Sequence, residues 1–329
     1  MQESAAQKID RLVMNTYGRT QVTFVEGSGC ELKDAEGRSY LDFLAGIAVC
    51  NLGHAHPGVA EAICRQAGRL VHVSNLYYTE PQVRVAELLI ENSFADRVFF
   101  CNSGAEANEG ALKLARLWGK ERLKGAHAVI VMEHSFHGRT LATLSATGQD
   151  KVQKGYDPLV AEFRRAPFGD LEAVAALMDE GVCAVLTEPV LGEGGVVLPP
   201  EGFLLGLREL CDKRGALLIF DEVQTGLGRT GKLFAHEHFN VTPDVMTLAK
   251  ALANGLPAGA VLARQEVADL FHPGSHATTF GAGPVVMAAA LRRSGVDVEP
   301  GVDTEAVRST GIHTLLGGGE PVGVVRPVL

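Results

Sequence analysis

The stretch RVFFCNSGAEANEGALKLARLWGK (residues 97–120) contains the step from strand to helix that decides the fold. The run RVFFCN (97–102) has the length and apolar composition of a buried β-strand. Ser103 follows it, with Glu106 three residues later, which is the pattern of a capping box. The periodic apolar residues beyond it predict a helix over 104–120. A strand therefore passes almost directly into a helix N-terminus.

The same alternation continues through the middle of the chain. Strand-length apolar runs recur at 128–132, 183–190 and 216–223, and amphipathic stretches lie at 171–178 and 202–215. Nearly continuous apolar strands that alternate with helices are typical of a mostly parallel sheet covered by helices on both faces. We predict an α/β fold of this kind, in which a ligand binds outside the carboxyl ends of the strands.

The two ends of the chain have a different character. Residues 22–46 alternate apolar and polar side chains, with turn signals at Glu26-Gly27 and Glu36-Gly37. This pattern predicts a small antiparallel hairpin region outside the main sheet. From about residue 292 onward, glycines and prolines occur without a sustained period, so we expect a poorly packed tail there.

Composition and charge exclude several classes of partner. The chain has 329 residues, 46% of them hydrophobic, which allows a large buried core in about two domains. Its formal net charge of −9 argues against a nucleic-acid partner, which needs a basic face. No apolar run reaches the ~18–20 residues of a membrane span, and the N-terminus MQESAAQKIDR lacks the apolar core of a signal peptide. We therefore expect a cytoplasmic protein without a nucleic-acid or membrane partner.

The cysteines and histidines do not form the spacings of a metal or disulfide framework. The six cysteines include no C-x-x-C pair, so we expect buried, reduced thiols. Three pairs of closely spaced histidines are present, namely His54 and His56, His134 and His137, and His236 and His238. None of them has an H-E-x-x-H pattern or a cysteine partner, so we expect no metal site.

The turn at Ser103-Gly104-Ala105 is a candidate anion site. A helix N-terminus presents free backbone N–H groups and the positive end of its dipole, and Gly104 lets a phosphate approach closely. Capping boxes are common, so an ordinary capped helix is the alternative interpretation. A second glycine motif, Gly226 to Gly231, fits G-x-G-x-x-G. A dinucleotide site needs a helix directly after those glycines, and residues 232–244 show no clear helical period, so we do not expect one.

An acid and a lysine end two further apolar runs. Asp221 closes the run ALLIF, and Lys250 ends the run VMTLA. A lysine among apolar residues has its neutral amine favoured by desolvation, which makes it a nucleophile toward carbonyl groups. The alternative is a surface lysine paired with an acid. A phosphate cradle, an acid for a pyridinium N–H and an amine for a Schiff base together meet the requirements of pyridoxal 5'-phosphate.

Eight ordered motifs, which run from about Met14 to Leu291, resemble the class III (subgroup II) pyridoxal-phosphate aminotransferases, and most closely the acetylornithine aminotransferases within that class. The motifs are NTYGRT, YLDFLAGIAV, NLGHAHP, FFCNSGAEANEGALKLAR, HSFHGRTLATLSATG, TEPVLGEGGV, IFDEVQTGLGRTGKLFA and LAKAL. The resemblance implies a fold type I pyridoxal-phosphate transferase. Lys250 would then bond the cofactor and move the proton, and Asp221 would pair with the pyridine nitrogen. Ser103, Gly104 and Ala105 would bind the phosphate.

The resemblance also implies contacts around the ring of the cofactor. Phe136 would stack on one face, Val223 would pack on the other, and Gln224 would lie near the phenolic oxygen. From the residues alone, Phe136 is equally a core aromatic and Gln224 a solvated turn residue. Thr279 would reach the phosphate of a neighbouring subunit, which implies a homodimer with a shared active site, although a threonine near a subunit contact is unremarkable.

Three residues are implied at the substrate. Arg139 would bind the carboxylate distal to the reacting amine, since a guanidinium can hold a carboxylate through two hydrogen bonds. Tyr17 would approach that end of the substrate from the N-terminal segment, and Glu193 would mask a second arginine. Ile47 stands where ornithine aminotransferases have a tyrosine, which favours an acetylated α-amine.

The implied reaction is a ping-pong transfer. N2-acetylornithine would give its δ-amino group to the cofactor, and 2-oxoglutarate would then accept it and leave as glutamate, a step of arginine biosynthesis. Two alternatives stay open. One is another ω-aminotransferase that acts on succinylornithine, succinyldiaminopimelate or 4-aminobutyrate, and the other is an inactive remnant that still binds the cofactor.

The resemblance stops after Leu291. The family continues with a C-terminal domain, which supplies a second arginine for the α-carboxylate of 2-oxoglutarate. We therefore expect that small domain to be largely absent and turnover to be weak, with a frameshift as one explanation. Ala253-Asn254-Gly255 and Gly281-Ala-Gly283-Pro284 also depart from the family pattern. The expected divisions are an N-terminal segment (1–50), a large cofactor-binding domain (51–283) and a divergent remnant of the small domain (284–329).

Overall fold

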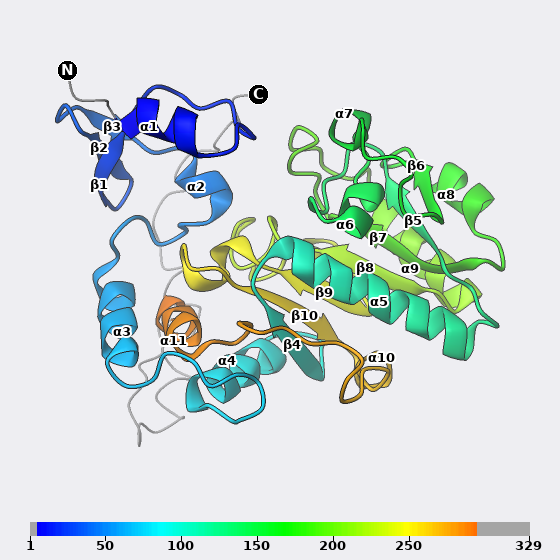
Figure 1. The fold of residues 1–329 in the computed structure, drawn as a ribbon. Coiled ribbons are helices and arrows are strands. Elements are labelled where there is room, and N and C mark those ends of the chain that lie inside the picture. Colours follow the sequence, from blue (N-terminus) through cyan, green and yellow to red (C-terminus); the bar gives the residue numbers. More distant parts are fainter. Residues whose placement is uncertain (1–4, 295–329) are drawn as a thin grey trace.

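A seven-stranded sheet forms the centre of the computed structural model, which describes residues 5–294 (Figure 1). Its strand order is β4-β10-β9-β8-β7-β5-β6. The strands are β4 (Arg97–Cys101), β5 (Ala128–Met132), β6 (Phe163–Ala166), β7 (Val182–Thr187), β8 (Leu217–Asp221), β9 (Val245–Leu248) and β10 (Gly259–Ala263). β10 is antiparallel to both of its neighbours, and the pairs from β9 to β6 are parallel. The prediction of a mostly parallel α/β sheet is confirmed.

Helices cover both faces of this sheet, as the apolar pattern predicts. The main helices packed around the sheet are α3 (Pro57–Ala67), α4 (Glu80–Glu91), α5 (Gly104–Arg122), α8 (Leu171–Leu177), α9 (Phe203–Arg214) and α11 (Pro284–Arg293). Short helical segments are α6 (Leu141–Ala146), α7 (Asp150–Gln153), α10 (Gln265–Ala268) and the 3-10 turns η1 (Ala235–His238) and η2 (Lys250–Ala253). The helices predicted at 104–120, 171–178 and 202–215 are present with ends shifted by at most two residues.

Alternate residues of one strand belong to opposite sides of the sheet. Val129 and Val131 of β5 join an apolar cluster that includes Leu114 of α5, whereas Ile130 joins a cluster that includes Leu207 of α9. Every residue of β5, β7 and β8 is buried. Burial on both faces explains why these strands are continuous apolar runs in the sequence.

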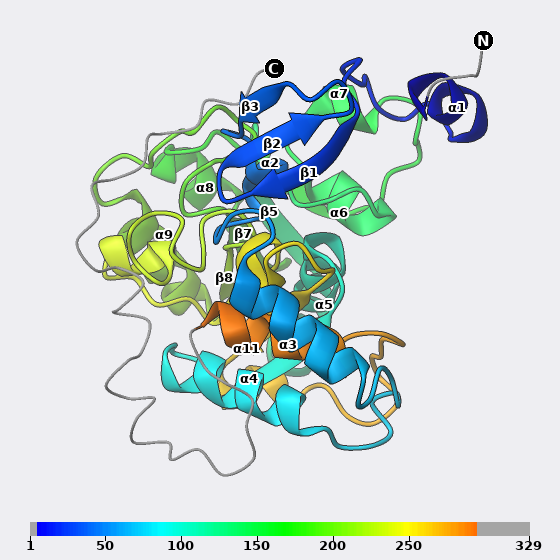
Figure 2. The ribbon, with the colours of Figure 1, turned by 90° about the vertical axis from the view of Figure 1, so that its left-hand side faces the viewer.

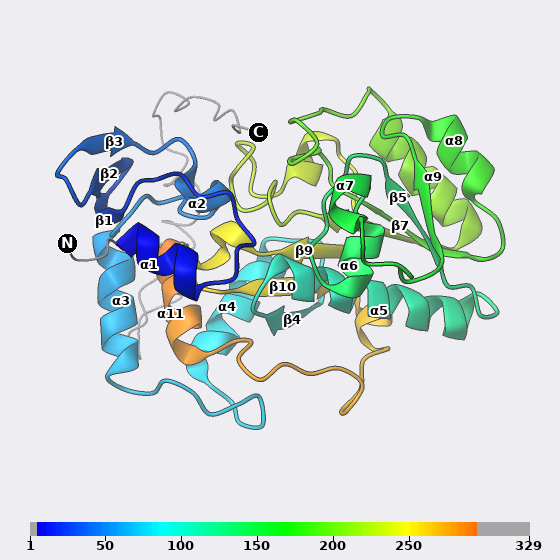
Figure 3. The same cartoon turned by 45° about the horizontal axis from the view of Figure 1, so that its top comes forward.

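The N-terminal region is a separate three-stranded antiparallel sheet at one end of the molecule (Figures 2 and 3). It comprises β1 (Phe24–Ser28), β2 (Glu31–Asp34) and β3 (Ser39–Leu41), between the short helices α1 (Ala5–Leu12) and α2 (Ala45–Ala48). The second predicted turn, at Glu36-Gly37, is confirmed. The first is wrong, because Glu26-Gly27 lies inside β1 and the chain turns at Gly29, which has a φ of +56°.

Helix α11 closes the described part of the chain. It packs against α3 and α4, and Figure 2 shows the three helices side by side. Leu291 and Met287 of α11 belong to the same buried cluster as Val59 of α3 and Leu89 of α4. The predicted tail lies almost entirely outside the described residues, and the domain boundaries drawn from the sequence stay predictions.

Helix α5 fits tightly against the loop before β5. A Cβ atom on Gly119 would collide with the carbonyl oxygen of Ala126 and would lie 2.7 Å from the Cβ of Cys183. Glycine is therefore the residue that lets the C-terminal half of α5 approach the sheet this closely.

Two further sequence interpretations concern the described residues. The Gly226–Gly231 motif lies in turns, and the next regular element is the single 3-10 turn η1, so no helix begins directly after those glycines. Within residues 5–294, no helix has both the length and the apolar character that a bilayer crossing requires.

Candidate active site

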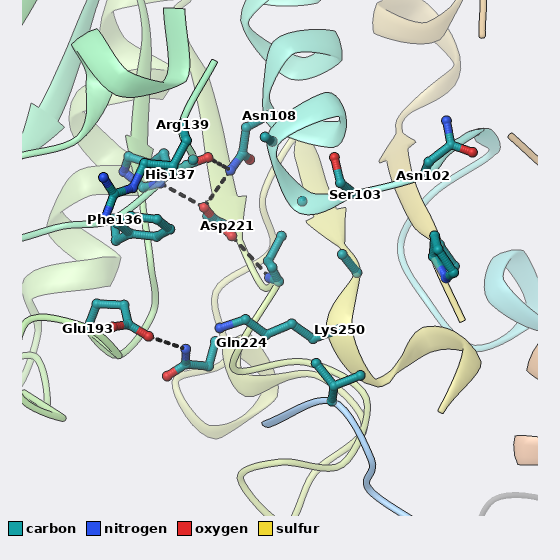
Figure 4. A pocket seen from close by; sticks show the side chains of 18 of the residues that line it. Asn102, Ser103, Asn108, Phe136, His137, Arg139, Glu193, Asp221, Gln224 and Lys250 are labelled. Atoms are coloured by element: carbon teal, nitrogen blue, oxygen red, sulfur yellow. Dashed lines mark hydrogen bonds and ion pairs between the residues drawn. The ribbon is translucent and has the colours of Figure 1, made fainter. Parts of the chain in front are cut away.

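A cavity of about 440 Å³ opens where several strands of the large sheet end (Figure 4). Asp221 is the last residue of β8, Lys250 follows β9, and Ser103 precedes α5. The segment from Phe136 to Arg139 follows β5. The predicted residues that line the cavity are Ser103, Gly104, Ala105, Phe136, Arg139, Glu193, Asp221, Val223, Gln224 and Lys250.

Asp221 is fixed by three hydrogen bonds. Its side chain is 3% exposed. Oδ2 accepts from Nδ2 of Asn108 at 2.7 Å and from Nδ1 of His137 at 2.7 Å, and Oδ1 accepts from the backbone N–H of Val223 at 3.0 Å. Figure 4 shows Asn108 and His137 converging on the carboxylate. A buried carboxylate with this many donors keeps a single orientation.

The N-terminus of α5 faces the same cavity. Oγ of Ser103 accepts from the N–H of Glu106 at 3.2 Å, as the capping pattern predicts. The reciprocal bond differs from the prediction, because the Glu106 carboxylate accepts from the N–H of Asn102, one residue before the cap, at 2.8 Å. The first amides of a helix have no intrahelical acceptor, so those of Gly104 and Ala105 are available to an anion.

Gly104 is in close contact with Val223. A Cβ atom at position 104 would lie 2.7 Å from Cγ1 of Val223. The valine therefore packs directly beside the helix N-terminus, between the predicted phosphate turn and Asp221. Because Gly104 has no side chain, Val223 can contact it directly, and these two predicted cofactor residues therefore lie side by side.

Lys250 has a strained backbone and a mostly buried side chain. Its φ is +37°, a value that side-chain-bearing residues rarely adopt. Burial lowers the pKa of its ammonium group below the usual value, although the carboxylates of Glu193, Asp221 and Glu188 oppose that effect. A lower pKa increases the share of neutral amine near pH 7, the form that reacts with carbonyl carbon.

The outer edge of the cavity carries charged and polar groups. The guanidinium of Arg139 lies over the ring of Phe136, 5.6 Å from its centroid. Nε2 of Gln224 donates to Oε1 of Glu193 at 3.3 Å. A side chain at Gly192 would collide with Gln224, so the glycine leaves room for this pair.

A sequence model of the family described as "Aminotransferase class-III" matches residues 13–295, which is most of the chain. The chain belongs to the class III aminotransferases. The resemblance predicted from the sequence over Met14 to Leu291 is thereby confirmed.

Individual relatives of this class III aminotransferase are similar over most of its length. The acetylornithine aminotransferase of Gloeobacter violaceus is 55% identical over 286 residues, which cover 87% of this chain and 71% of that protein. The succinylornithine transaminase of Salmonella paratyphi A is 50% identical over 286 residues, which cover 86% of this chain and 70% of that protein.

Solved structures of the family agree with the fold. The ornithine aminotransferase of Toxoplasma gondii ME49 superposes with a TM-score of 0.84 at 36% identity, over 87% of this chain and 69% of that one. The acetylornithine aminotransferase of Elizabethkingia anophelis gives a TM-score of 0.77 at 35% identity, over 88% of this chain and 70% of that one.

Class III aminotransferases use pyridoxal 5'-phosphate, and the cavity of this one fits that group. The α5 N-terminus suits its phosphate, the fixed carboxylate of Asp221 suits its ring nitrogen, and the amine of Lys250 suits its aldehyde. All three lie in one cavity, and the volume of about 440 Å³ is within the usual range for a small-molecule site.

Two predicted residues lie away from the cavity. Tyr17 is 71% exposed and packs with Arg19, whose guanidinium lies 5.5 Å from its ring centroid. Thr279 is exposed as well, whereas its neighbour Thr278 accepts a hydrogen bond from Nδ2 of Asn102 at 3.0 Å. Neither Tyr17 nor Thr279 is brought to the cavity by the described chain, and their roles stay predictions.

Four polar residues that line the cavity were not predicted as site residues, namely Asn102, Asn108, His137 and Glu188. Glu188 is 4% exposed, and its carboxylate accepts from the N–H groups of Phe136 and Gly192, each at 3.0 Å. It thereby connects the loop of Phe136 with the loop of Glu193, and burial raises its pKa above the usual value. The signal for Asn108 was available, because it is a polar residue among the apolar positions of the helix that follows the phosphate turn.

Proposed function

We propose that this aminotransferase transfers the δ-amino group of N2-acetylornithine to 2-oxoglutarate, a step of arginine biosynthesis. The observation that carries the transfer chemistry is the shared cavity of Lys250, Asp221 and the α5 N-terminus. The amino donor is supported by the relatives, since several that are about half identical to this chain are named acetylornithine aminotransferases.

The residues at the bottom of the cavity have separate proposed roles. When bound, pyridoxal 5'-phosphate supplies a ring that stabilises negative charge on the reacting carbon. Lys250 would hold this group through its aldehyde, and once the amino donor has taken that place, the freed amine Nζ would accept the proton from the substrate carbon and donate it to the cofactor carbon. Asp221 would keep a proton on the ring nitrogen of the bound group. The N–H groups of Gly104 and Ala105, with Oγ of Ser103, bind the phosphate.

The remaining cavity residues orient the ring and the substrates. We assign the two faces of the ring to Phe136 and Val223, and its phenolic oxygen to Gln224. Arg139 would hold the α-carboxylate of the donor through two hydrogen bonds. Glu193 would mask a second substrate arginine when the amino donor binds. Its side chain is exposed, and among the described residues its hydrogen bonding is the contact with Gln224 at 3.3 Å, so it can move.

The proposal includes a homodimer with a shared active site. The segments 70–78 and 278–281 form one surface, in which Nδ2 of Asn75 donates to the carbonyl of Gly281 at 2.9 Å. Tyr78 is fully exposed on this surface and Phe280 is 66% exposed. Such apolar exposure is typical of an interface, and Thr279 would reach the partner's phosphate from it. Sedimentation velocity measures the association, and cell fractionation tests the expected cytoplasmic location.

A panel of amino donors tests the proposed reaction. With 2-oxoglutarate as acceptor, we expect the highest kcat/KM with N2-acetylornithine, followed by succinylornithine, and much lower values with 4-aminobutyrate. Succinylornithine is the second candidate donor, because one relative at 50% identity is named for it. A clear preference for 4-aminobutyrate would contradict the proposal.

The Lys250→Ala variant provides the control for that panel. Borohydride treatment should attach the cofactor covalently to the wild-type chain at Lys250 and should not do so in the variant. Labelling at Lys250 without turnover of any donor would favour the inactive remnant over the transaminase.

A further inference from the structure

Helix α5 carries a side chain that holds Asp221 from behind. Asn108 lies four residues after Gly104, so it lies on the same face of the helix as Gly104, one turn further along. It is 1% exposed and lines the cavity. The helix that presents the phosphate turn therefore also reaches the carboxylate at the other end of the site (Figure 4).

The orientation of the Asn108 amide is set by three hydrogen bonds. Oδ1 accepts from Oγ1 of Thr247 on β9 at 2.8 Å. Nδ2 donates to Oδ2 of Asp221 at 2.7 Å and to the carbonyl oxygen of His137 at 2.8 Å. Because the Asp221 carboxylate and the His137 carbonyl can only accept, the NH2 group has to face them, and the Thr247 hydroxyl donates to Oδ1.

His137 supplies the second donor to the same oxygen. Nδ1 carries the proton in this bond, since the carboxylate can only accept. Nε2 is buried and has no hydrogen-bond partner among residues 5–294. Within the described chain, the imidazole ring therefore directs its hydrogen bonding to Asp221 alone.

The two oxygens of Asp221 are consequently different. Oδ2 already has two donors, which match its two lone pairs. Among the described residues, Oδ1 has only the N–H of Val223 at 3.0 Å, which leaves one of its lone pairs available. A ring N–H that meets Asp221 in this cavity has to bond Oδ1.

We infer that Asn108, with Thr247 behind it, is a positioning residue that keeps Oδ1 of Asp221 directed at the ring nitrogen and keeps the proton on that nitrogen. The inference rests on the proposed function, which places the pyridine ring against Asp221. Without the amide, the carboxylate can rotate and loses a donor. A carboxylate with fewer donors is more basic, which moves the shared proton from the ring to the carboxyl group.

The 15N chemical shift of holoenzyme loaded with cofactor labelled at the ring nitrogen tests this directly. The wild type should give the shift of a protonated pyridine, and Asn108→Leu should move it toward the neutral value. We expect kcat to fall roughly tenfold to a hundredfold, the range that one hydrogen bond to a charged group accounts for, with KM for the donor little changed. The affinity of the apo-protein for pyridoxal 5'-phosphate should fall as well.

Two further variants keep the test decisive. Thr247→Val removes the hydroxyl that orients the amide, so it should change the 15N shift in the same direction by a smaller amount, even if Asn108→Leu does not fold. Gln66→Leu is the matched control, because it also removes a buried side-chain amide. Gln66 lies outside the cavity, where its Nε2 donates to the carbonyl oxygen of Leu70 at 2.9 Å. It should leave the shift unchanged.

The possible failures can be told apart. A wild-type shift with both Asn108→Leu and Thr247→Val would overturn the positioning role and leave the proposed function intact. A wild-type enzyme without a protonated ring nitrogen would contradict the proposed function, and the inference with it.

Discussion

The floor and the rim of the cavity are built in opposite ways. The floor (Asp221, Asn108 and His137) is at most 3% exposed, and its members form hydrogen bonds to one another of 2.7 to 2.8 Å. At the rim (Arg139, Glu193 and Gln224), the described hydrogen bonding is the single contact of 3.3 Å between Gln224 and Glu193. The floor is thus fixed before any ligand binds, whereas the rim can rearrange around successive substrates.

This difference separates two kinds of effect. A fixed floor favours the charge that develops during the reaction, so its loss should lower kcat. A rim that contacts the substrate in both ground state and transition state should mainly change KM.

The largest expected effect is at the centre of the floor. Asp221→Asn replaces the charged acceptor with a neutral amide, so the ring nitrogen loses its proton and kcat should fall roughly a hundredfold or more. Single-turnover absorbance measurements of cofactor conversion would quantify the loss.

The matched control for that variant is Asp244→Asn. Asp244 is 2% exposed, pairs with Arg208 and Arg264, and lies outside the cavity. Its substitution should lower the melting temperature and leave kcat of the folded enzyme nearly unchanged. An equal loss of kcat in both variants would mean that the floor has no special electrostatic role.

A smaller effect is expected at the rim. Arg139→Lys keeps the charge but loses the planar pair of donors, so KM for N2-acetylornithine should rise about tenfold with little change in kcat. Steady-state kinetics at saturating 2-oxoglutarate measures the split. Arg164→Lys, whose guanidinium pairs with Asp179 outside the cavity at 2.8 Å, is the control. A fall in kcat at constant KM would assign Arg139 to the floor instead.

The smallest expected effect concerns the pKa of Lys250. The carboxylate of Glu193 raises that pKa against the lowering by burial. Glu193→Gln removes this charge, so the pKa should fall further and more of the amine should be neutral at a given pH. The rate at which apo-protein binds pyridoxal 5'-phosphate, followed against pH, should then reach its midpoint at lower pH than in wild type. A midpoint that moves to higher pH would show that Glu193 acts on Lys250 by another route.

The predictability of the strands follows from burial. β5, β7 and β8 are predictable because they are buried on both faces, so their sequences are continuous apolar runs. β10 and β6 were not predicted from the sequence. β10 is rich in glycine and alanine, and β6 contains two arginines, so local composition does not favour a strand in either. Their place in the sheet depends on pairing with distant segments.

The same limit applies to the site. Asp221 and Lys250 were predictable because each ends an apolar run that belongs to the sheet. His137 was not, since it becomes a functional candidate only when β8 and the loop after β5 lie together. Asn108 stands out in the sequence only as a polar residue among the apolar positions of α5, and its partner Asp221 is not evident before the fold is known. His137 was considered as half of a histidine pair with His134, and its contact with Asp221 spans 84 positions of the chain.

Gly119 lies near the C-terminal end of α5, and the length of that helix connects it to the active site. About 15 residues, or roughly 22 Å of helix, separate it from Gly104. A methyl group there would press on the Ala126 carbonyl and lift the far end of the helix. Because a rigid rod transmits such a displacement, the cradle and the Asn108 amide would move together at the other end. A substitution of Gly119, far from the cavity, would then misalign the phosphate-binding turn and Asp221 and so lower the rate of transfer.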